Sequence, residues 1–322
     1  MPEIAPITVV LISRNRAAQL RRVIPAIAQG TLRPSEVLLA DDASDDDTVK
    51  VFEALCRECG VQGRPLLHEP GKTSFRINSM RNAGLRASQT ERLILLDADH
   101  VPATTHIASH MRMLDRGRTT MSFGPRLESA NEDGSGPVNF MWGHEPYGSM
   151  SPSTNEPLPY WELVAGSNLG MHRSFAAEIG DYDTEYDGGY GYDDVDFNCR
   201  AAALGAMFYG EFDAHVVHLP HPTSTGVRNG TRNAELFERK NGAKLRYPAI
   251  VPWVTHGANW AARYALFREH GSAIPLHAEG APPEAGEPSK AMTRWASSNV
   301  GGRFLLRLAF EKLLGRFGGR GS

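Results

Sequence analysis

Two aspartates and a histidine stand at the end of an apolar run in the stretch RLILLDADHVP, residues 92–102. Residues 93–96 have the continuous apolar character of a strand buried on both faces. Asp97, Asp99 and His100 follow directly. Two carboxylates one residue apart can reach one divalent cation, and Mg²⁺ and Mn²⁺ prefer such hard oxygen ligands. A helix cap followed by a turn would use the same residue types, so the pattern allows a metal site or a local capping motif.

A second acidic pair ends another apolar run, EVLLADDAS at residues 36–44. Further strands are expected at residues 7–12 and 65–69, with helical segments between them, of which SFRINSMRNAGLRAS at 74–88 is one. This alternation predicts an α/β fold with a mostly parallel sheet flanked by helices. Ligands bind outside the carboxyl ends of such strands, so we expect both acidic pairs at one edge of the sheet.

Length and composition restrict the class of protein. The chain has 322 residues, a net charge of -3 and 41% hydrophobic residues, which suits one large globular domain or two closely packed ones. The charge argues against a protein-wide electrostatic grip on nucleic acid. Three cysteines do not make a disulfide framework. With no apolar run long enough to span a bilayer and no leader pattern, the expected location is cytoplasmic.

The chain divides by pattern into four expected parts. Residues 1–125 carry the strand and helix alternation, and residues 126–270 are rich in Gly, Pro, Trp and Tyr. A Pro, Gly and Glu linker at 271–290 leads to a basic amphipathic helix in 291–322. The apolar and basic surface at 303–317 can lie on the inner face of an anionic membrane, or dock on its own domain or a second subunit.

Four segments in this order give the first half a specific resemblance: TVVLISRNRAAQL, EVLLADDASDDDT, RNAGLRAS and LILLDADHVP. Together, over residues 7 to about 125, they resemble the nucleotide-sugar-binding half of a GT-A (Rossmann-like) glycosyltransferase of the family 2 type. The resemblance implies a UDP-sugar donor and a bound Mn²⁺ or Mg²⁺ held by Asp97 and Asp99. The residues that it implies at the donor are Ser13, Arg14, Asp42, Arg81, Asn82 and Asp97.

The second half contains WELVAGSNLGMHRSFAAEIGDYDTEYDGGYGYDDVDFNCRAAALG, residues 161–205. It resembles the C-terminal catalytic segment of galactosyltransferases, chondroitin-type polymerases and polypeptide N-acetylgalactosaminyltransferases. The resemblance implies that Asp193 orients the acceptor and that Asp194 is the general base, with Tyr190 or Tyr192 lining the acceptor site. That family often has Glu at the first acidic position, and Asp193 departs from this. The alternative reading is that these acids stabilise a helix N-terminus.

The segment AHVVHLPHP, residues 214–222, supplies histidines downstream of the acidic pair. In the related enzymes a histidine at this place completes the metal site, which implies His218, with His221 as the second candidate. A purely structural histidine is the alternative.

These features predict a metal-dependent, inverting glycosyltransferase that moves a sugar from a UDP-sugar to a hydroxyl of a glycan, lipid-linked or small-molecule acceptor. A nucleotidyltransferase also uses paired acids and a metal, but the turn SRNRAAQL lacks the glycines that it needs. A non-catalytic nucleotide-sugar-binding protein is the alternative from another class. A homo-oligomer is compatible with the sequence.

Overall fold

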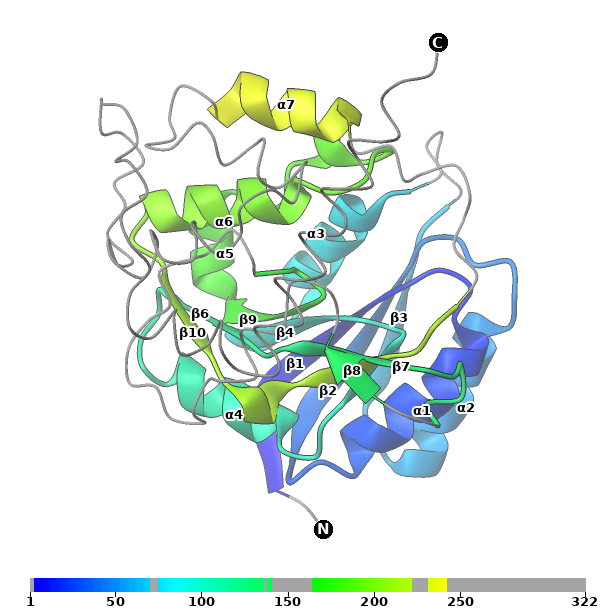
Figure 1. Ribbon diagram of the computed structural model, residues 1–322. Helices are drawn as coiled ribbons and strands as arrows, with labels where there is room; N and C mark the ends of the chain where they lie inside the picture. Colours follow the sequence, from blue (N-terminus) through cyan, green and yellow to red (C-terminus); the bar gives the residue numbers. More distant parts are fainter. Residues whose placement is uncertain (1–2, 70–74, 136–137, 141–163, 222–230, 242–322) are drawn as a thin grey trace.

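The computed structural model describes residues 3–69, 75–135, 138–140, 164–221 and 231–241 (Figure 1). The expected linker at 271–290 and the amphipathic helix with its 303–317 surface lie outside the described residues, as does part of the expected second half. Within the described ranges, no helix is long and apolar enough to cross a membrane.

A seven-stranded sheet forms the centre of the fold, in the strand order β10-β6-β9-β4-β1-β2-β3. Its bounds are β1 Glu3–Ser13, β2 Leu32–Asp41, β3 Gly63–Leu67, β4 Arg92–Asp97, β6 Thr120–Phe123, β9 Asn168–His172 and β10 Met207–Gly210. The pairs β1–β2, β1–β4, β2–β3 and β10–β6 are parallel. Strand β9 runs antiparallel to both β4 and β6. The predicted mostly parallel α/β sheet is confirmed, with β9 as the inserted exception.

Helices cover both faces of this sheet (Figure 1). One face carries α1 Ala17–Ala28, α2 Thr48–Cys59 and α4 His106–Leu114, and the other carries α3 Ile77–Ala87, α5 Arg173–Ile179, α6 Asp193–Ala203 and α7 Thr231–Asn241. Alternate residues of β1 enter the two cores, since successive strand side chains point to opposite faces. Val10 and Ile12 pack in the core under α3 and α6, whereas Val9 and Leu11 pack under α1 and α2.

Helix α1 contains Pro25, and a proline inside a helix usually kinks or breaks it. The helix continues from Ala17 to Ala28 with Pro25 inside, and Gln29 N–H still bonds to the Pro25 carbonyl at 3.0 Å. Leu20, Val23, Ile24 and Ile27 are buried as their helical spacing predicts. Burial of this apolar face keeps the helix in place although proline removes one of its hydrogen bonds.

A second, four-stranded sheet has the order β5-β11-β7-β8. Its bounds are β5 His100–Pro102, β7 Arg126–Ser129, β8 Val138–Phe140 and β11 Val216–His218. Strand β5 begins three residues after β4 ends, and β11 pairs with it antiparallel so that His218 stands opposite His100. This pairing joins residues 100–102 to residues 216–218, more than one hundred positions later in the chain. It places the histidine that ends β11 beside the acids that follow β4.

Candidate active site

Strand register brings the predicted acids to one edge. In the parallel sheet Ser13 pairs with Asp41, and Ile12 pairs with Asp97. The ends of β1, β2 and β4 therefore lie side by side, and Asp42 and Asp99 follow just beyond them. The expectation that both acidic pairs meet at the carboxyl edge of the sheet is confirmed by these pairings.

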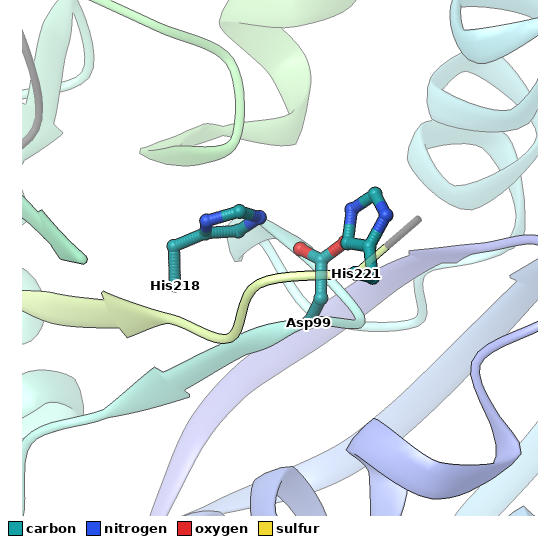
Figure 2. Close-up of side chains that lie close together, drawn as sticks. All are labelled: Asp99, His218 and His221. Carbon is teal, nitrogen blue, oxygen red and sulfur yellow. The ribbon is translucent and has the colours of Figure 1, made fainter. Parts of the chain in front are cut away.

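One carboxylate and two imidazoles form a cluster beyond this edge (Figure 2). The ligand atoms of Asp99, His218 and His221 all lie within 4.8 Å of one another. Figure 2 shows the Asp99 carboxylate between the two rings. The backbone holds the arrangement, because Leu219 N–H donates to the Asp99 carbonyl at 2.9 Å. Both histidine candidates from the sequence therefore reach the same aspartate.

The donor set suits a divalent cation. Asp97, Asp99 and His100 form a second, overlapping group with ligand atoms within 4.8 Å. Among the described residues, Asp97 Oδ1 and His100 Nε2 are buried atoms without a hydrogen-bond partner. Buried polar atoms are rarely left so, and an ion would satisfy them. Asp99 belongs to both groups, and Asp97, His100, His218 and His221 are the other residues that could hold it.

The protonation states agree with ligation. Burial and the nearby His100 lower the pKa of His218 to about 4, so its imidazole is neutral at pH 7 and keeps a lone pair. Burial alone would raise the pKa of Asp99, but hydrogen bonds from His100 and His221 hold it well below the ordinary value. His100 Nδ1 lies 2.7 Å from Asp99 Oδ1. The cluster thus presents a carboxylate and a neutral imidazole.

The predicted nucleoside residues lie at the neighbouring strand ends. Ser13 is buried, and its hydroxyl finds no partner in the described part of the chain. Asp42 is buried too, and Arg76 Nε donates to its Oδ1 at 2.7 Å. Arg14 Nη1 lies 4.0 Å from Asp42 Oδ2. Arg76 was not predicted from the sequence, and only its position just before α3 could have suggested it.

The structure places Arg81 and Asn82, the residues predicted to contact the donor, against other groups of the protein. Arg81 is 2% exposed, and its Nη1 lies 2.5 Å from Asp193 Oδ2 and 2.8 Å from Asp194 Oδ1. Asn82 bonds both backbone groups of Tyr182, at 2.7 and 2.8 Å. These side chains face the acidic pair and its support. The sequence signal for their burial was their position on α3, about one turn before the buried Leu85.

Asp194 has the properties of a general base. Burial raises its pKa to about 6, Arg81 opposes the rise, and Asp193 adds to it. Its side chain retains 25% exposure, so a bound hydroxyl can reach it. At pH 7 a carboxylic acid with this pKa is mostly ionised and remains basic enough to accept a proton. Gly166 lies against the carboxylate, where an added Cβ would stand 2.4 Å from Asp194 Oδ1.

The two tyrosines predicted at the acceptor site have different environments. Tyr190 is 54% exposed, which leaves its ring available. Tyr192 is 6% exposed, belongs to the main core and packs on Phe237 of α7 with ring centroids 5.7 Å apart. Tyr192 therefore supports the loop before α6, and its predicted place on the acceptor surface is wrong, because α7 covers it.

Helix α7 holds the loop that leads to Asp193 and Asp194, a role that the sequence did not indicate. Asn233 Nδ2 donates to the carbonyls of Tyr186 at 3.1 Å and Gly191 at 2.9 Å. At the far end of the helix, Asn241 donates to Asp196 at 2.9 Å. Asp196 also bonds Arg200, so it acts within α6 and its supports.

The sequence model of glycosyl transferase family 2 matches residues 8–180. This span is more than half of the chain, and the chain belongs to that family. The matched residues include the second half of β1, all of β2, α3 and β4, and the predicted residues that end or follow these elements. The resemblance found in the sequence is thereby confirmed, and family membership counts against a nucleotidyltransferase.

Known proteins with similar sequence or structure fit this membership. The hyaluronan synthase of Pasteurella multocida is 22% identical over 231 residues, which are 63% of this chain and 23% of that protein. The chain therefore spans about a quarter of that relative. GalNAc-T7, crystallised with UDP, GalNAc and Mn²⁺, has a TM-score of 0.56 at 16% identity, covering 95% of this chain and 56% of the other.

A third similar protein has a different donor. The mannosyltransferase PcManGT from Pyrobaculum calidifontis, in complex with GDP-Man and Mn²⁺, has a TM-score of 0.55 at 16% identity, covering 97% and 89% of the two chains. At these identities the likeness establishes the fold, which is GT-A.

Proposed function

We propose that this chain is a Mn²⁺-dependent, inverting glycosyltransferase that transfers a sugar from a UDP-sugar to a hydroxyl of a carbohydrate or glycoconjugate. The observation that carries the proposal is the position of Asp97. It belongs to the cation-ligand group with Asp99 and His100, and its backbone N–H donates to the carbonyl of Ser167, whose neighbour Gly166 lies against Asp194. A donor held at the cation group would therefore present its sugar near the base.

The proposed step is a single displacement. The acceptor hydroxyl attacks the anomeric carbon from the face opposite the diphosphate. The bond from that carbon to the diphosphate oxygen breaks, and the hydroxyl proton passes to the Asp194 carboxylate. A single displacement inverts the anomeric centre. A general base at this position contributes typically about 10²–10⁴-fold.

The choice of cation follows from the donor set. A bound divalent cation would supply positive charge to the diphosphate as it leaves. Mg²⁺ strongly prefers oxygen ligands, whereas His218 and His221 add nitrogen ligands to the Asp99 carboxylate. We therefore favour Mn²⁺ over Mg²⁺, and the Mn²⁺ in GalNAc-T7 and PcManGT supports this choice.

The choice of donor base is supported by Asp42, whose carboxylate can accept from the imide N–H of uracil. GalNAc-T7 with its bound UDP supports the same choice. The polysaccharide synthase among the relatives supports a glycan acceptor.

A panel of UDP-sugars and GDP-sugars, assayed for nucleotide release with Mn²⁺, Mg²⁺ or EDTA, tests the proposal. We expect slow release of UDP from one donor with Mn²⁺, less with Mg²⁺, and none with EDTA. Release from GDP-sugars alone would contradict the donor assignment. Donor binding without any turnover, even with candidate glycan acceptors, would favour the non-catalytic binding protein.

A further inference from the structure

Arg16 connects the cation group to the turn after β1. Its Nε donates to Asp99 Oδ2 at 2.8 Å, and its Nη2 lies 3.0 Å from His221 Nε2. Its Nη1 donates to the carbonyls of Arg14 at 3.0 Å and Asn15 at 3.1 Å. One guanidinium thus contacts two of the predicted cation ligands and the backbone beside the predicted nucleoside residues.

These contacts use the atoms that a cation would need. Both Asp99 oxygens are engaged, Oδ1 by His100 and Oδ2 by Arg16 and His221. His221 Nε2 can accept from Arg16 or donate to Asp99 Oδ2, 3.1 Å away. Ligation through His221 Nε2 requires the lone pair of that nitrogen, so neither bonding pattern persists if Nε2 binds the cation. A guanidinium also repels a cation at this distance.

The backbone of Arg16 is fixed independently of its side chain. Its N–H donates to Thr48 Oγ1 at 2.8 Å, and its carbonyl accepts from Leu20 N–H at 3.0 Å in the first turn of α1. The side chain is 22% exposed, whereas that of Asp99 is 8% exposed. Arg16 can therefore leave Asp99 by rotation of its own side chain.

We propose that Arg16 takes the place of the divalent cation and pairs with Asp99 when no metal is bound. When a divalent cation binds, the Arg16 side chain leaves Asp99 and pairs with the donor diphosphate. The inference rests on the proposed function and adds a positioning role that couples cation to donor. A diphosphate carries the negative charge that the released guanidinium needs, and Arg forms bidentate bonds with phosphate groups. Arg16 thereby opposes cation binding alone and favours it when donor is present.

The test uses reciprocal coupling. If the cation and the donor both act on Arg16, each must change the affinity of the other by the same factor. The measurement is Mn²⁺ affinity by calorimetry on EDTA-treated protein, with and without UDP, for the wild type and Arg16→Met. We expect Arg16→Met to bind Mn²⁺ alone on the order of tenfold more tightly than the wild type. UDP should then strengthen Mn²⁺ binding by a smaller factor in Arg16→Met than in the wild type.

Arg14→Met is the matched control, because Arg14 lies in the same turn and is 46% exposed without a contact to Asp99 among those described. It removes the same charge, and Mn²⁺ affinity in the absence of UDP should stay within about twofold of wild type, since exposed charges are well screened. A gain equal to that of Arg16→Met would overturn the competition and indicate a general charge effect. Arg16→Gln replaces Arg16→Met if the latter does not fold.

The outcomes separate this inference from the proposed function. Mn²⁺ binding that is equal or weaker in Arg16→Met than in the wild type overturns the role of Arg16 and leaves the metal-dependent reaction intact. Absence of Mn²⁺ binding in both proteins, with and without UDP, overturns both. Tight binding by the variant and weak binding by the wild type supports both.

Discussion

Arg81 Nη1 lies 2.8 Å from Asp194 Oδ1, in a setting where Arg81 is 2% exposed. Asp193 contacts the same nitrogen at 2.5 Å, and the Tyr182 ring stacks on the guanidinium at 4.8 Å. One buried cation therefore serves two carboxylates, including the proposed base. It keeps Asp194 more acidic than burial alone would make it.

Replacing Arg81 with Met should destabilise the fold. The change leaves two carboxylates near each other without their cation, and breaking a buried pair costs about 3–5 kcal/mol. Urea unfolding of Arg81→Met measures this loss. Arg86→Met is the control on the same helix, because Arg86 is 71% exposed and pairs with Asp181. It should cost less than about 1 kcal/mol, and equal losses would contradict the role given to Arg81.

The pH dependence of turnover should report Asp194. Its pKa of about 6 predicts that kcat/KM falls as pH drops through about 6, because the protonated acid cannot act as a base. His218, with a pKa of about 4, protonates only in more acidic solution. The profile of donor hydrolysis between pH 4.5 and 8 at saturating Mn²⁺ tests this. A rate that is flat from pH 5 to 8 would rule out Asp194 as the base.

Gly166→Ala should disturb the base without touching the cation group. An added Cβ would lie 2.4 Å from Asp194 Oδ1 and 2.9 Å from Arg81 Cζ, so the carboxylate must move. A displacement of the base by about 1 Å lowers turnover by about 10²-fold. UDP and Mn²⁺ affinities should stay at wild-type values, because Asp42 and Asp99 lie on other elements. Unchanged turnover in a folded variant would show that Asp194 need not stand where the structure has it.

A buried histidine pair should make the fold sensitive to acid. Asn168 Nδ2 donates to two backbone carbonyls, which leaves its Oδ1 to accept from His106 Nε2 at 2.8 Å and His110 Nε2 at 3.1 Å. Both rings therefore donate through Nε2. Burial lowers the pKa of His106 to about 4 from an ordinary 6.5, and the pKa of His110 also falls.

A lowered histidine pKa means that the unfolded chain binds the proton first as pH falls. The contribution of the neutral rings to the free energy of unfolding is complete above pH 6.5 and is lost progressively down to about pH 4. For His106 alone this loss is about 3 kcal/mol. Urea unfolding at pH 7.5 and 4.5 measures the difference. The double variant His106→Gln, His110→Gln keeps amide donors that do not titrate, so its loss between these pH values should be smaller. An equal loss would remove these histidines from the explanation.

Much of this site could be predicted from local sequence, because strand ends and acids are adjacent in the chain. RLILLDAD showed that Asp97 and Asp99 follow a buried strand, and the parallel order of β1, β2 and β4 then placed Asp42 near them. The match of Asp193 and Asp194 to a helix start also held, since α6 begins at Asp193.

The remainder depended on contacts between distant segments. His218 reaches Asp99 because β11 pairs with β5, and no local pattern specifies that pairing. Arg81 turned to Asp193 and Asp194 because the start of α6 lies beside it, and a buried guanidinium must find carboxylates. Tyr192 was misplaced for a similar reason: its exposure depended on α7, which follows it by almost forty residues.

The most direct test of the account compares Asp194→Asn with Asp99→Asn. If the cation group binds the donor and Asp194 acts on the acceptor, Asp194→Asn should keep Mn²⁺ and UDP affinity while nucleotide release falls by about 10²–10⁴-fold. Asp99→Asn should lose Mn²⁺ binding and turnover together. Wild-type turnover in Asp194→Asn, or full Mn²⁺ affinity in Asp99→Asn, would contradict the division of roles on which the proposed function rests.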